Sequence, residues 1–467
     1  MEDRVRPLND LPLCSEAKYV LYWSQMNRRV EGNHALDYAV RQANELNLPV
    51  LYYEGLTCSY PWANDRFHTF LLEGVPDTSA RLASLGIGYV FYLRRRQADP
   101  NNVLYQLAAD AALVVTDDYP TFVAAKHNAS VSKKIRVAFH AVDSSCIVPM
   151  NKMVKREWAA YTIRPKIHRM LPEYLNAVEL PPVRRRYKGE TPPYHVNVET
   201  LGIPSLVASC EIDHSVRPSI SYRGGEQEAH LHLEHFLENN LRRYAGARNE
   251  PSQHATSDLS PYLHFGCISS LQTALLASAY AERHKLMAGE FLEELIVRRE
   301  LAFNFARFAT KPDSLDNLPE WVLRTLGDHI GDKREHAYDR DEFASASTHD
   351  ALWNATQKEM LLRGKIHGYY RMYWGKKIIE WSRTYQDALD TMVYIHDRWA
   401  LDGRDPNTYT NILWCFGLHD RPWQERAIFG KVRYMTLDGM RRKTNVDAYI
   451  REIELLERTG KDPFRLI

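Results

Sequence analysis

Aromatic residues and an arginine fall at helical intervals within one stretch of the chain, residues 348–410. Segment 366–383 contains no proline, and its apolar residues recur near the helical period, which predicts one helix. On that helix Arg371, Trp374 and Trp381 lie at i, i+3 and i+10 and therefore share a face. At 1.5 Å per residue the two indoles are about 10 Å apart along the axis. One helix face thus presents two large rings beside a cation.

The turn-forming sequence DGRDPN, residues 402–407, follows this helix. It supplies the carboxylate of Asp402 and backbone amides shortly after the segment that carries Arg371. An arginine–carboxylate clasp across a planar cofactor uses such groups. The alternative interpretation is that Trp353, Trp374 and Trp381 only fill a core and that 402–407 is a surface turn.

Earlier in the chain, small hydroxyl residues precede another candidate helix: Thr256, Ser257 and Ser260, around Pro261. Serine and threonine are favoured at helix N-termini, where free amides and the helix dipole attract phosphate. This pattern predicts a phosphate-binding helix start. A helix start without a ligand is the alternative.

Length and composition indicate a globular protein of two or three domains, because 467 residues exceed one ordinary core. Apolar residues make up 45% and charged residues 25% of the chain, and the formal net charge is +1. Global charge therefore does not indicate a polyanion partner, so any nucleic-acid site must be a local basic patch.

The six cysteines are widely spaced, without a CxxC pair or a His/Cys cluster of metal-ligand spacing. We therefore expect reduced thiols and no metal site. The first residues do not resemble a signal peptide, and no apolar run approaches the ~20 residues that span a bilayer. The expectation is a soluble protein without membrane contact, cytoplasmic, or nuclear or organellar in a eukaryote.

Secondary-structure patterns divide the chain into three parts. Residues 1–180 alternate short β-rich runs with helical stretches, which predicts an α/β domain with a parallel, Rossmann-like sheet, although GxGxxG is absent. Residues 181–225 carry PPVRRRYKGETPP and few periodic apolar residues, which is typical of a linker. Residues 226–467 have helical periodicity throughout and predict an all-helical domain.

Several long motifs of the helical part resemble the photolyase/cryptochrome flavoproteins. TSDLSPYLHFG is similar to the element that holds the cofactor's pyrophosphate in that family. Specific resemblance to class II cyclobutane pyrimidine dimer photolyases comes from THDALWNATQ, GKIHGYYRMYWGKKIIEW, LDGRDPN, LHDRPW and GKVRYM. The resemblance covers nearly the whole chain, strongly from about residue 240 to 445 and loosely before residue 180.

This resemblance implies that the helical domain holds FAD, reduced in the active form. The matching FAD-contacting positions are Tyr244, Thr256, Ser257, Leu259, Ser260, Arg371, Asp402 and Gly403. Trp353, Trp374 and Trp381 match the tryptophans through which the family photoreduces its flavin. Because Trp374 and Trp381 share a helix face, we expect an electron to pass directly between them.

The resemblance also implies a pocket for the lesion in ultraviolet-damaged, double-stranded DNA. Its matching positions are Arg248, Asn249, Glu300, Asn304, Trp414 and Arg433. Glu300 and Asn304 lie at i and i+4, so a carboxyl here can face a pyrimidine edge, unless it forms an ion pair with a neighbouring arginine. Lys431 and residues 441–443 can form the local basic patch or a solvated face.

Two positions depart from the family pattern. His396 stands where the family places an asparagine that reaches the flavin, and a histidine can be charged near neutral pH. Phe303 stands where the family places an aspartate, which makes that part of the pocket less polar. Residues 28–35 differ from the usual antenna-site pattern, so a second chromophore stays an open question.

The leading functional prediction is a monomeric, class II-like deoxyribodipyrimidine photolyase. Reduced FAD would donate an electron, after light absorption, to a pyrimidine dimer flipped out of the DNA. One alternative is a cryptochrome-like blue-light receptor that keeps the flavin and the tryptophans without repair activity. The other is a flavoenzyme that acts on a small molecule, suggested by His396 and Phe303 together. His264 and His419 are assigned no catalytic role.

Overall fold

The computed structural model describes residues 1–14 and 16–466. A six-stranded sheet forms the first part of the chain, in the order β1-β6-β5-β2-β3-β4. All neighbouring pairs are parallel except β1 with β6. The strands are β1 (Val5–Pro7), β2 (Tyr19–Ser24), β3 (Val50–Thr57), β4 (Gly88–Arg94), β5 (Ala111–Asp117) and β6 (Ala138–Val142). This is the Rossmann-like α/β arrangement that the sequence predicts.

Burial explains why the central strands read as continuous apolar runs. Every residue of β2 and of β5 is buried, since helices cover a parallel sheet on both faces. The α/β part contains α1 (His34–Glu45), α2 (Asp65–Glu73), α3 (Val75–Leu85), α4 (Val103–Ala108) and α5 (Phe122–Val131). Asn33 begins α1 by accepting hydrogen bonds from the amides of Ala35 and Leu36 at its side chain.

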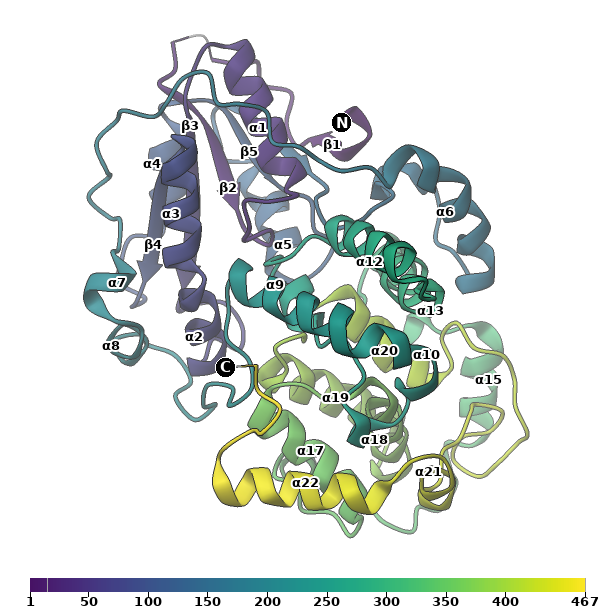
Figure 1. Cartoon of the computed structure of the whole chain (residues 1–467). Helices are drawn as coiled ribbons and strands as arrows, with labels where there is room; N and C mark the ends of the chain where they lie inside the picture. The colour runs from purple at the N-terminus through teal and green to yellow at the C-terminus, as the bar shows by residue number, and fades with distance from the viewer. Residues whose placement is uncertain (15, 467) are drawn as a thin grey trace.

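The connection between sheet and helices is long and contains three helices, α6 (Ala160–Tyr174), α7 (Val198–Leu201) and α8 (Ile203–Ala208). Figure 1 shows α6 standing away from the sheet, and the following chain returning over the α/β part towards α7. Backbone bonds fix this path, from Tyr187 N to Gly86 O at 2.8 Å and from Val196 N to Phe91 O at 2.8 Å.

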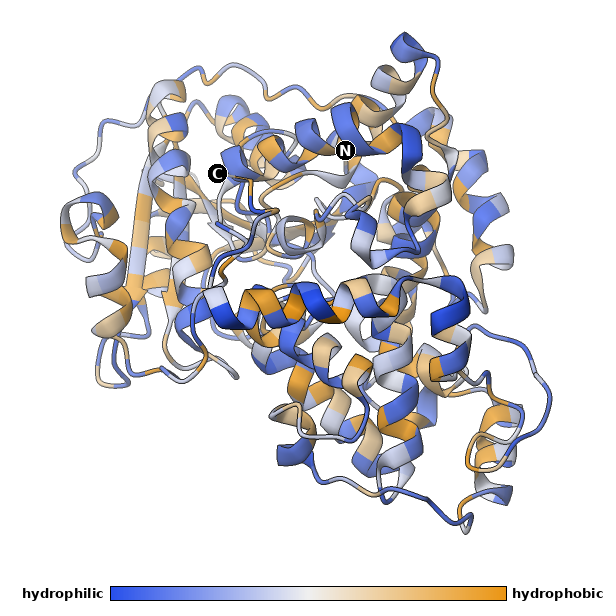
Figure 2. Cartoon of the chain, turned by 60° about the horizontal axis from the view of Figure 1, so that its bottom comes forward, coloured by the Kyte–Doolittle hydropathy of each residue, from blue (hydrophilic) through white to orange (hydrophobic). Residues whose placement is uncertain are grey.

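The rest of the described chain is helical. Its main helices are α9 (Glu226–His235), α10 (Leu241–Ala247), α11 (Ser260–His264), α12 (Ser270–His284), α13 (Gly289–Leu292), α14 (Arg299–Phe308), α15 (Glu320–Asp328), α16 (Arg340–Ala344), α17 (Ala351–Arg363), α18 (Gly368–Trp381), α19 (Tyr385–Trp399), α20 (Pro406–Phe416), α21 (Leu437–Lys443) and α22 (Val446–Thr459). Helix α22, which comes forward in Figure 2, carries both hydrophobic and hydrophilic residues, and it buries Val446, Tyr449, Ile453 and Leu456, as expected for an amphipathic surface helix.

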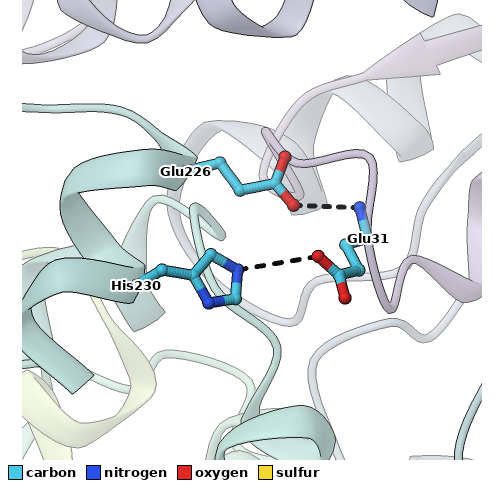
Figure 3. A group of neighbouring side chains, drawn as sticks. All are labelled: Glu31, Glu226 and His230. Carbon is cyan, nitrogen blue, oxygen red and sulfur yellow. Dashed lines mark hydrogen bonds and ion pairs between the residues drawn. The ribbon is translucent and has the colours of Figure 1, made fainter. Parts of the chain in front are cut away.

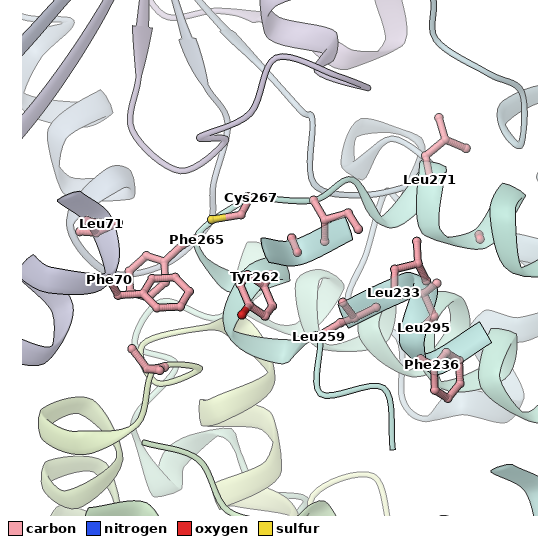
Figure 4. Packing of buried hydrophobic residues seen from close by; sticks show 14 of the residues in the cluster. Phe70, Leu71, Leu233, Phe236, Leu259, Tyr262, Phe265, Cys267, Leu271 and Leu295 are labelled. Atoms are coloured by element: carbon pink, nitrogen blue, oxygen red, sulfur yellow. The ribbon is translucent and has the colours of Figure 1, made fainter. Parts of the chain in front are cut away.

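One hydrophobic cluster joins the two parts. Phe70 of α2 lies 5.6 Å from Tyr262 and 5.2 Å from Phe265, measured between ring centroids. Figure 4 shows these rings beside Leu259 and Leu233 of the helical part. The interface is therefore packed as a core and holds the helical part rigidly against the sheet.

Polar contacts add to this junction. Glu226 of α9 accepts the amides of Val30 and Glu31, and His230 approaches Glu31, with nitrogen and oxygen 3.9 Å apart (Figure 3). Arg81 pairs with both carboxylates, at 2.9 Å from Glu226 and 3.3 Å from Glu31. These side chains tie the loop before α1 to α9. Among the helices of residues 1–14 and 16–466, none is long and apolar enough to cross a membrane.

Candidate functional site

An arginine–carboxylate pair marks the centre of the helical part. Arg371 Nη2 of α18 donates to Asp402 Oδ2 at 2.8 Å and to Ile366 O at 3.1 Å. Ser260 Oγ donates to the same Asp402 oxygen at 2.7 Å. Burial alone raises the pKa of Asp402, but Arg371 outweighs it and holds the pKa below its ordinary value. The pair is therefore ionised and fixed.

Some buried polar atoms of the pair and of the neighbouring His396 make no hydrogen bond within the part of the chain that the structure describes. Arg371 Nε, Asp402 Oδ1 and His396 Nδ1 are buried and have no hydrogen-bond partner among the described residues. The three groups are neighbours, since Arg371 and Asp402 both act on the pKa of His396. Buried polar atoms without partners are rare and imply a missing ligand or water. A planar group with polar edges, such as a flavin ring, fits this set of donors and acceptors.

His396 is neutral at physiological pH, although a histidine can carry a positive charge there. It lies on α19 and is 1% exposed. Burial, followed by the nearby Arg371, lowers its pKa to about 3. Its ring meets Trp374 edge-on, with centroids 5.2 Å apart. His396 therefore offers one neutral donor or acceptor atom to the site.

A glycine makes room at the turn after α19. A Cβ atom on Gly403 would come within 2.4 Å of His396 O and 3.0 Å of Ala400 O. Any other residue would displace the neighbouring Asp402 or push His396 out of place. The glycine of DGRDPN, Gly403, is thus required for the close packing of this turn beside Asp402.

The hydroxyl residues before α11 do not cap that helix as predicted. Leu259 stands at the N-cap position without a side-chain hydrogen bond, and it is buried. The hydroxyl of Ser260 is used by Asp402, and Thr256 Oγ1 donates to Asp258 Oδ1 at 3.1 Å. The reason is that these side chains are engaged by neighbouring carboxylates. The positive charge here comes from Lys365, which pairs with Asp258.

A pocket of about 560 Å³ opens beside this segment. Its lining includes Thr256, Asp258, Lys365 and His367, and Ser257 lies half-buried next to them. Tyr244 of α10 is half-buried elsewhere, with its ring 5.6 Å from both Phe236 and Phe291. Of the predicted cofactor residues, Ser260, Arg371 and Asp402 are thus brought into direct contact, and Tyr244 is not shown in contact with them.

The three tryptophans form one continuous chain, but in a different order from the prediction. Trp353 of α17 stacks on Trp374 with centroids 6.3 Å apart and planes 7° apart. Trp381 meets Trp353 with centroids 6.4 Å apart and planes at 64°. Direct passage between Trp374 and Trp381 was the expectation; instead the indole of Trp353 lies between them, because α17 packs against α18. The order is Trp374, Trp353, Trp381.

Aromatic rings and cations alternate on the other side of α18. Lys376 Nζ lies 5.1 Å from the Trp414 ring centroid, and the Arg433 guanidinium lies 5.4 Å from the same centroid. Arg433 also lies 4.1 Å from the ring of Trp423, which is 39% exposed. Burial lowers the pKa of Lys376 to about 8. Trp414 and Arg433 are therefore brought together, with Lys376 and Trp423 as partners that the sequence analysis missed.

Glu300 and Asn304 lie apart from Trp414, at the junction with the α/β part, where they line a smaller pocket together with Phe303. Glu300 Oε1 accepts the amides of Ile147 at 2.6 Å and Val148 at 3.1 Å. Asn304 accepts the amide of Glu157 at 2.7 Å. A buried carboxyl takes the nearest free donors, and the chain entering the helical part supplies them. Burial raises the pKa of Glu300 to about 8.

Phe303 and the two predicted pocket residues Arg248 and Asn249 have different surroundings. Phe303 is buried against Tyr119 of the α/β part, with centroids 5.5 Å apart, and so contributes to the interface. Arg248 pairs with Glu290 at 3.1 Å and Glu294 at 2.8 Å. Asn249 is exposed after α10.

Another pocket, of about 700 Å³, lies where the two parts meet at the carboxyl ends of β2 and β3. Its lining includes Trp23, Arg28, Phe122, His127 and Arg404. Arg404 is fully buried and lies 3.8 Å from the Phe67 ring centroid. The absence of GxGxxG concealed this site, and the signal for it in the sequence is Arg404 within DGRDPN.

Comparison with known proteins supplies independent information. A family model described as DNA photolyase matches residues 20–184. The deoxyribodipyrimidine photo-lyase of Methanothermobacter thermautotrophicus is 41% identical over 452 residues, 97% of this chain and 98% of that protein. That of Arabidopsis thaliana is 36% identical over 458 residues, 95% of this chain and 90% of that protein.

Solved structures agree in fold. A bacterial class III photolyase from Agrobacterium tumefaciens superposes with a TM-score of 0.65 at 17% identity, covering 96% of this chain and 93% of that chain. This likeness supports the combination of an α/β sheet with a helical second part.

Proposed function

This chain belongs to the DNA photolyase family, and from that premise we propose that it repairs cyclobutane pyrimidine dimers in DNA with light. The relatives named deoxyribodipyrimidine photo-lyase match over nearly their full length. The observation that carries the proposal is the clasp of Arg371 and Asp402 with unpartnered buried atoms around it. We further propose class II, on the tryptophan motifs and LDGRDPN.

The cofactor proposed for the clasp is FAD, which when bound in reduced form supplies the light-driven electron that splits the dimer. Arg371 and Asp402 bind and orient the ring, and the guanidinium keeps a positive charge beside it. His396 presents a neutral ring nitrogen to the ligand. Asp402 and His396 are buried and Arg371 is half-buried, and in such surroundings electrostatic interactions are stronger than in water.

Electron supply to the site is the proposed role of Trp374, Trp353 and Trp381. The ring centroids are 6.3 Å apart between Trp374 and Trp353 and 6.4 Å apart between Trp353 and Trp381. Trp374 contacts His396 at the clasp, while Trp381 lies against His349 and Tyr338 at the other end. The chain of rings therefore runs from the cofactor site towards the outside of the helical part.

The partner we propose is double-stranded DNA that carries a dimer, bound by a protein monomer. Trp414 offers an aromatic wall for the unstacked bases, and Arg433 adds a cation next to it. Exposed basic residues extend this side, namely Lys431 and, in the last turn of α21, Arg441, Arg442 and Lys443. They supply the local positive charge that a nearly neutral chain needs to hold phosphates.

We also propose that the pocket at β2 and β3 takes a second, light-harvesting chromophore. It lies outside the carboxyl ends of parallel strands, where ligands bind in such sheets. Aromatic rings and the cations Arg28 and Arg404 suit a planar, anionic molecule. An absorbance band distinct from that of flavin in the purified protein would support the proposal, and a spectrum of flavin alone would contradict it.

The test of the proposed function uses an oligonucleotide with a single thymine dimer, reduced protein and blue light. We expect thymine recovery in the light and none in the dark. Absence of recovery under illumination, with flavin bound and reduced, would reject repair and favour one of the two alternatives.

A further inference from the structure

Helix α14 holds the segment that leads into α6. Arg299 Nη1 donates to Ser145 O at 2.6 Å, and Arg307 Nη2 donates to Asn151 Oδ1 at 3.3 Å. Asn304 binds this segment twice, accepting from Glu157 N at 2.7 Å and donating to Lys155 O at 3.0 Å. Together with Glu300, which accepts the amides at 147 and 148, these bonds fix the segment along α14.

Large apolar side chains project into solvent from the end of this fixed segment. Val154 is 89% exposed, Trp158 56% and Tyr161 66%. The backbone around Trp158 is tied down, since Trp158 N and Ala159 N both donate to Thr162 Oγ1. A rigidly held, exposed cluster of this kind marks a binding surface. We call Val154, Lys155, Trp158 and Tyr161 the Trp158 patch.

The charge around the patch is positive. Residues 152–169 contain six lysines and arginines against one acidic residue, Glu157. Lys166 neutralises Glu157, and Arg164 pairs with Glu293 at 2.6 Å. Among residues 1–14 and 16–466, no acidic partner lies within ion-pair distance of Lys155 or Arg169, and both are exposed. Lysines beside exposed aromatic rings are the combination that binds nucleic acid.

The patch is also connected to the proposed lesion side. Arg156, between Lys155 and Glu157, lies 4.7 Å from the Phe305 ring centroid. The Phe305 ring meets His419 edge-on at 6.2 Å. The next residue, Asp420, pairs with Arg433 at 3.1 Å. A short series of contacts thus runs from the patch to the arginine beside Trp414.

We propose that the Trp158 patch is a second DNA contact, which grips the duplex beside the lesion. Lys155 reaches a phosphate, and the rings of Trp158 and Tyr161 lie against sugars or base faces of the flanking strand. The inference rests on the proposed function, because it needs damaged DNA as the partner. The patch would add contacts to the flanking strand of the duplex, which the lesion pocket alone does not make.

The test compares a duplex that carries one thymine dimer with a bare thymine dinucleotide dimer, which has no flanking strand. Trp158→Ala is expected to weaken duplex binding about tenfold, the size of one aromatic stacking contact. Its repair of the bare dinucleotide should equal that of the unmodified protein. Lys155→Ala should reduce the slope of log affinity against log salt by about 1.

Two controls keep the outcomes distinct. Trp158→Phe retains a ring and should restore most duplex affinity, while Leu201→Ala, at an exposed apolar residue of α7 on the other side of Figure 1, should change nothing. Unchanged duplex affinity in both Trp158→Ala and Lys155→Ala would overturn the proposal. Equal losses on duplex and dinucleotide would also overturn it, since the patch would then act through the fold. If the unmodified protein repairs neither substrate, the proposed function itself fails.

Discussion

At the scale of single residues, the site combines one strong ion pair with a neutral histidine. Arg371 and Asp402 are fixed by Ser260 and by the Ile366 carbonyl, so the clasp keeps its geometry before any ligand binds. His396 stays uncharged because burial and Arg371 both oppose its protonation. Near neutral pH, Arg371 is therefore positively charged, Asp402 is negatively charged and His396 is neutral.

Asp402 tests the ion pair through stability against pH. Its folded-state pKa lies below the ordinary value, so the carboxylate stabilises the fold above about pH 4 and loses that effect as pH falls further. Asp402→Asn should therefore be less stable than the unmodified protein at pH 7. The difference in unfolding free energy should shrink in acid. A difference independent of pH would contradict the ion pair; urea unfolding of the flavin-free proteins measures it.

His396 predicts a loss of stability in the same direction, over a higher pH interval. Its folded pKa of about 3 lies below the ordinary value near 6.5, so the fold loses stability as pH falls from about 6.5 towards 3. His396→Asn removes the titration, and its stability relative to the unmodified protein should rise over that interval. Thermal unfolding at several pH values measures this. If the variant and the unmodified protein lose stability in parallel, His396 is not a buried neutral group.

Glu300 shows the reverse sign. Burial raises its pKa to about 8, so the protonated carboxyl stabilises the fold below about pH 4.5 and the effect is lost as pH rises through 8. Glu300→Gln keeps an acceptor for the amides of Ile147 and Val148 and removes the titration. The variant should gain stability relative to the unmodified protein between about pH 4.5 and 8. Equal stability across that range would show that Glu300 is ionised in the fold.

At the scale of elements, the packing of α17 against α18 determines the order of the rings in the proposed electron path. The helical period correctly predicts that Trp374 and Trp381 belong to one helix, α18. It does not show that Trp353, from another helix, enters between their rings, because periodicity describes one element at a time. Its indole N–H donates to Trp374 O at 3.0 Å, which fixes the ring in place.

Trp353→Phe tests that order. Loss of the middle indole should remove most light-driven reduction of bound flavin, since the two outer rings are joined through it. Protein reduced chemically should still repair a dimer. The fold should lose about 1–3 kcal/mol. Trp321→Phe, at a half-buried indole outside the chain of rings, is the matched control. Undiminished photoreduction in Trp353→Phe, measured by absorbance under illumination, would contradict this path.

At the scale of the whole molecule, sequence patterns predict the architecture better than the interface. Alternating strands and helices predict the sheet, and the later helical period predicts the helical part, since these are local signals. The contacts that Glu300 and Phe303 make with the α/β part could not be predicted, because they join residues about 150 or more positions apart. No local pattern reports such long-range packing. The pockets at Arg404 and at Thr256 arise in the same way, from segments distant in sequence.

The central claim is that a flavin held by Arg371 and Asp402 receives electrons through the tryptophans and splits a dimer in DNA. The most direct test is one illumination experiment on purified protein with an oligonucleotide that contains a thymine dimer, followed by absorbance and by thymine recovery. We predict a yellow protein that is reduced in blue light and restores the thymines, with Arg371→Ala unable to retain the flavin. A colourless protein that takes up no added FAD, or full repair by Arg371→Ala, would contradict the account.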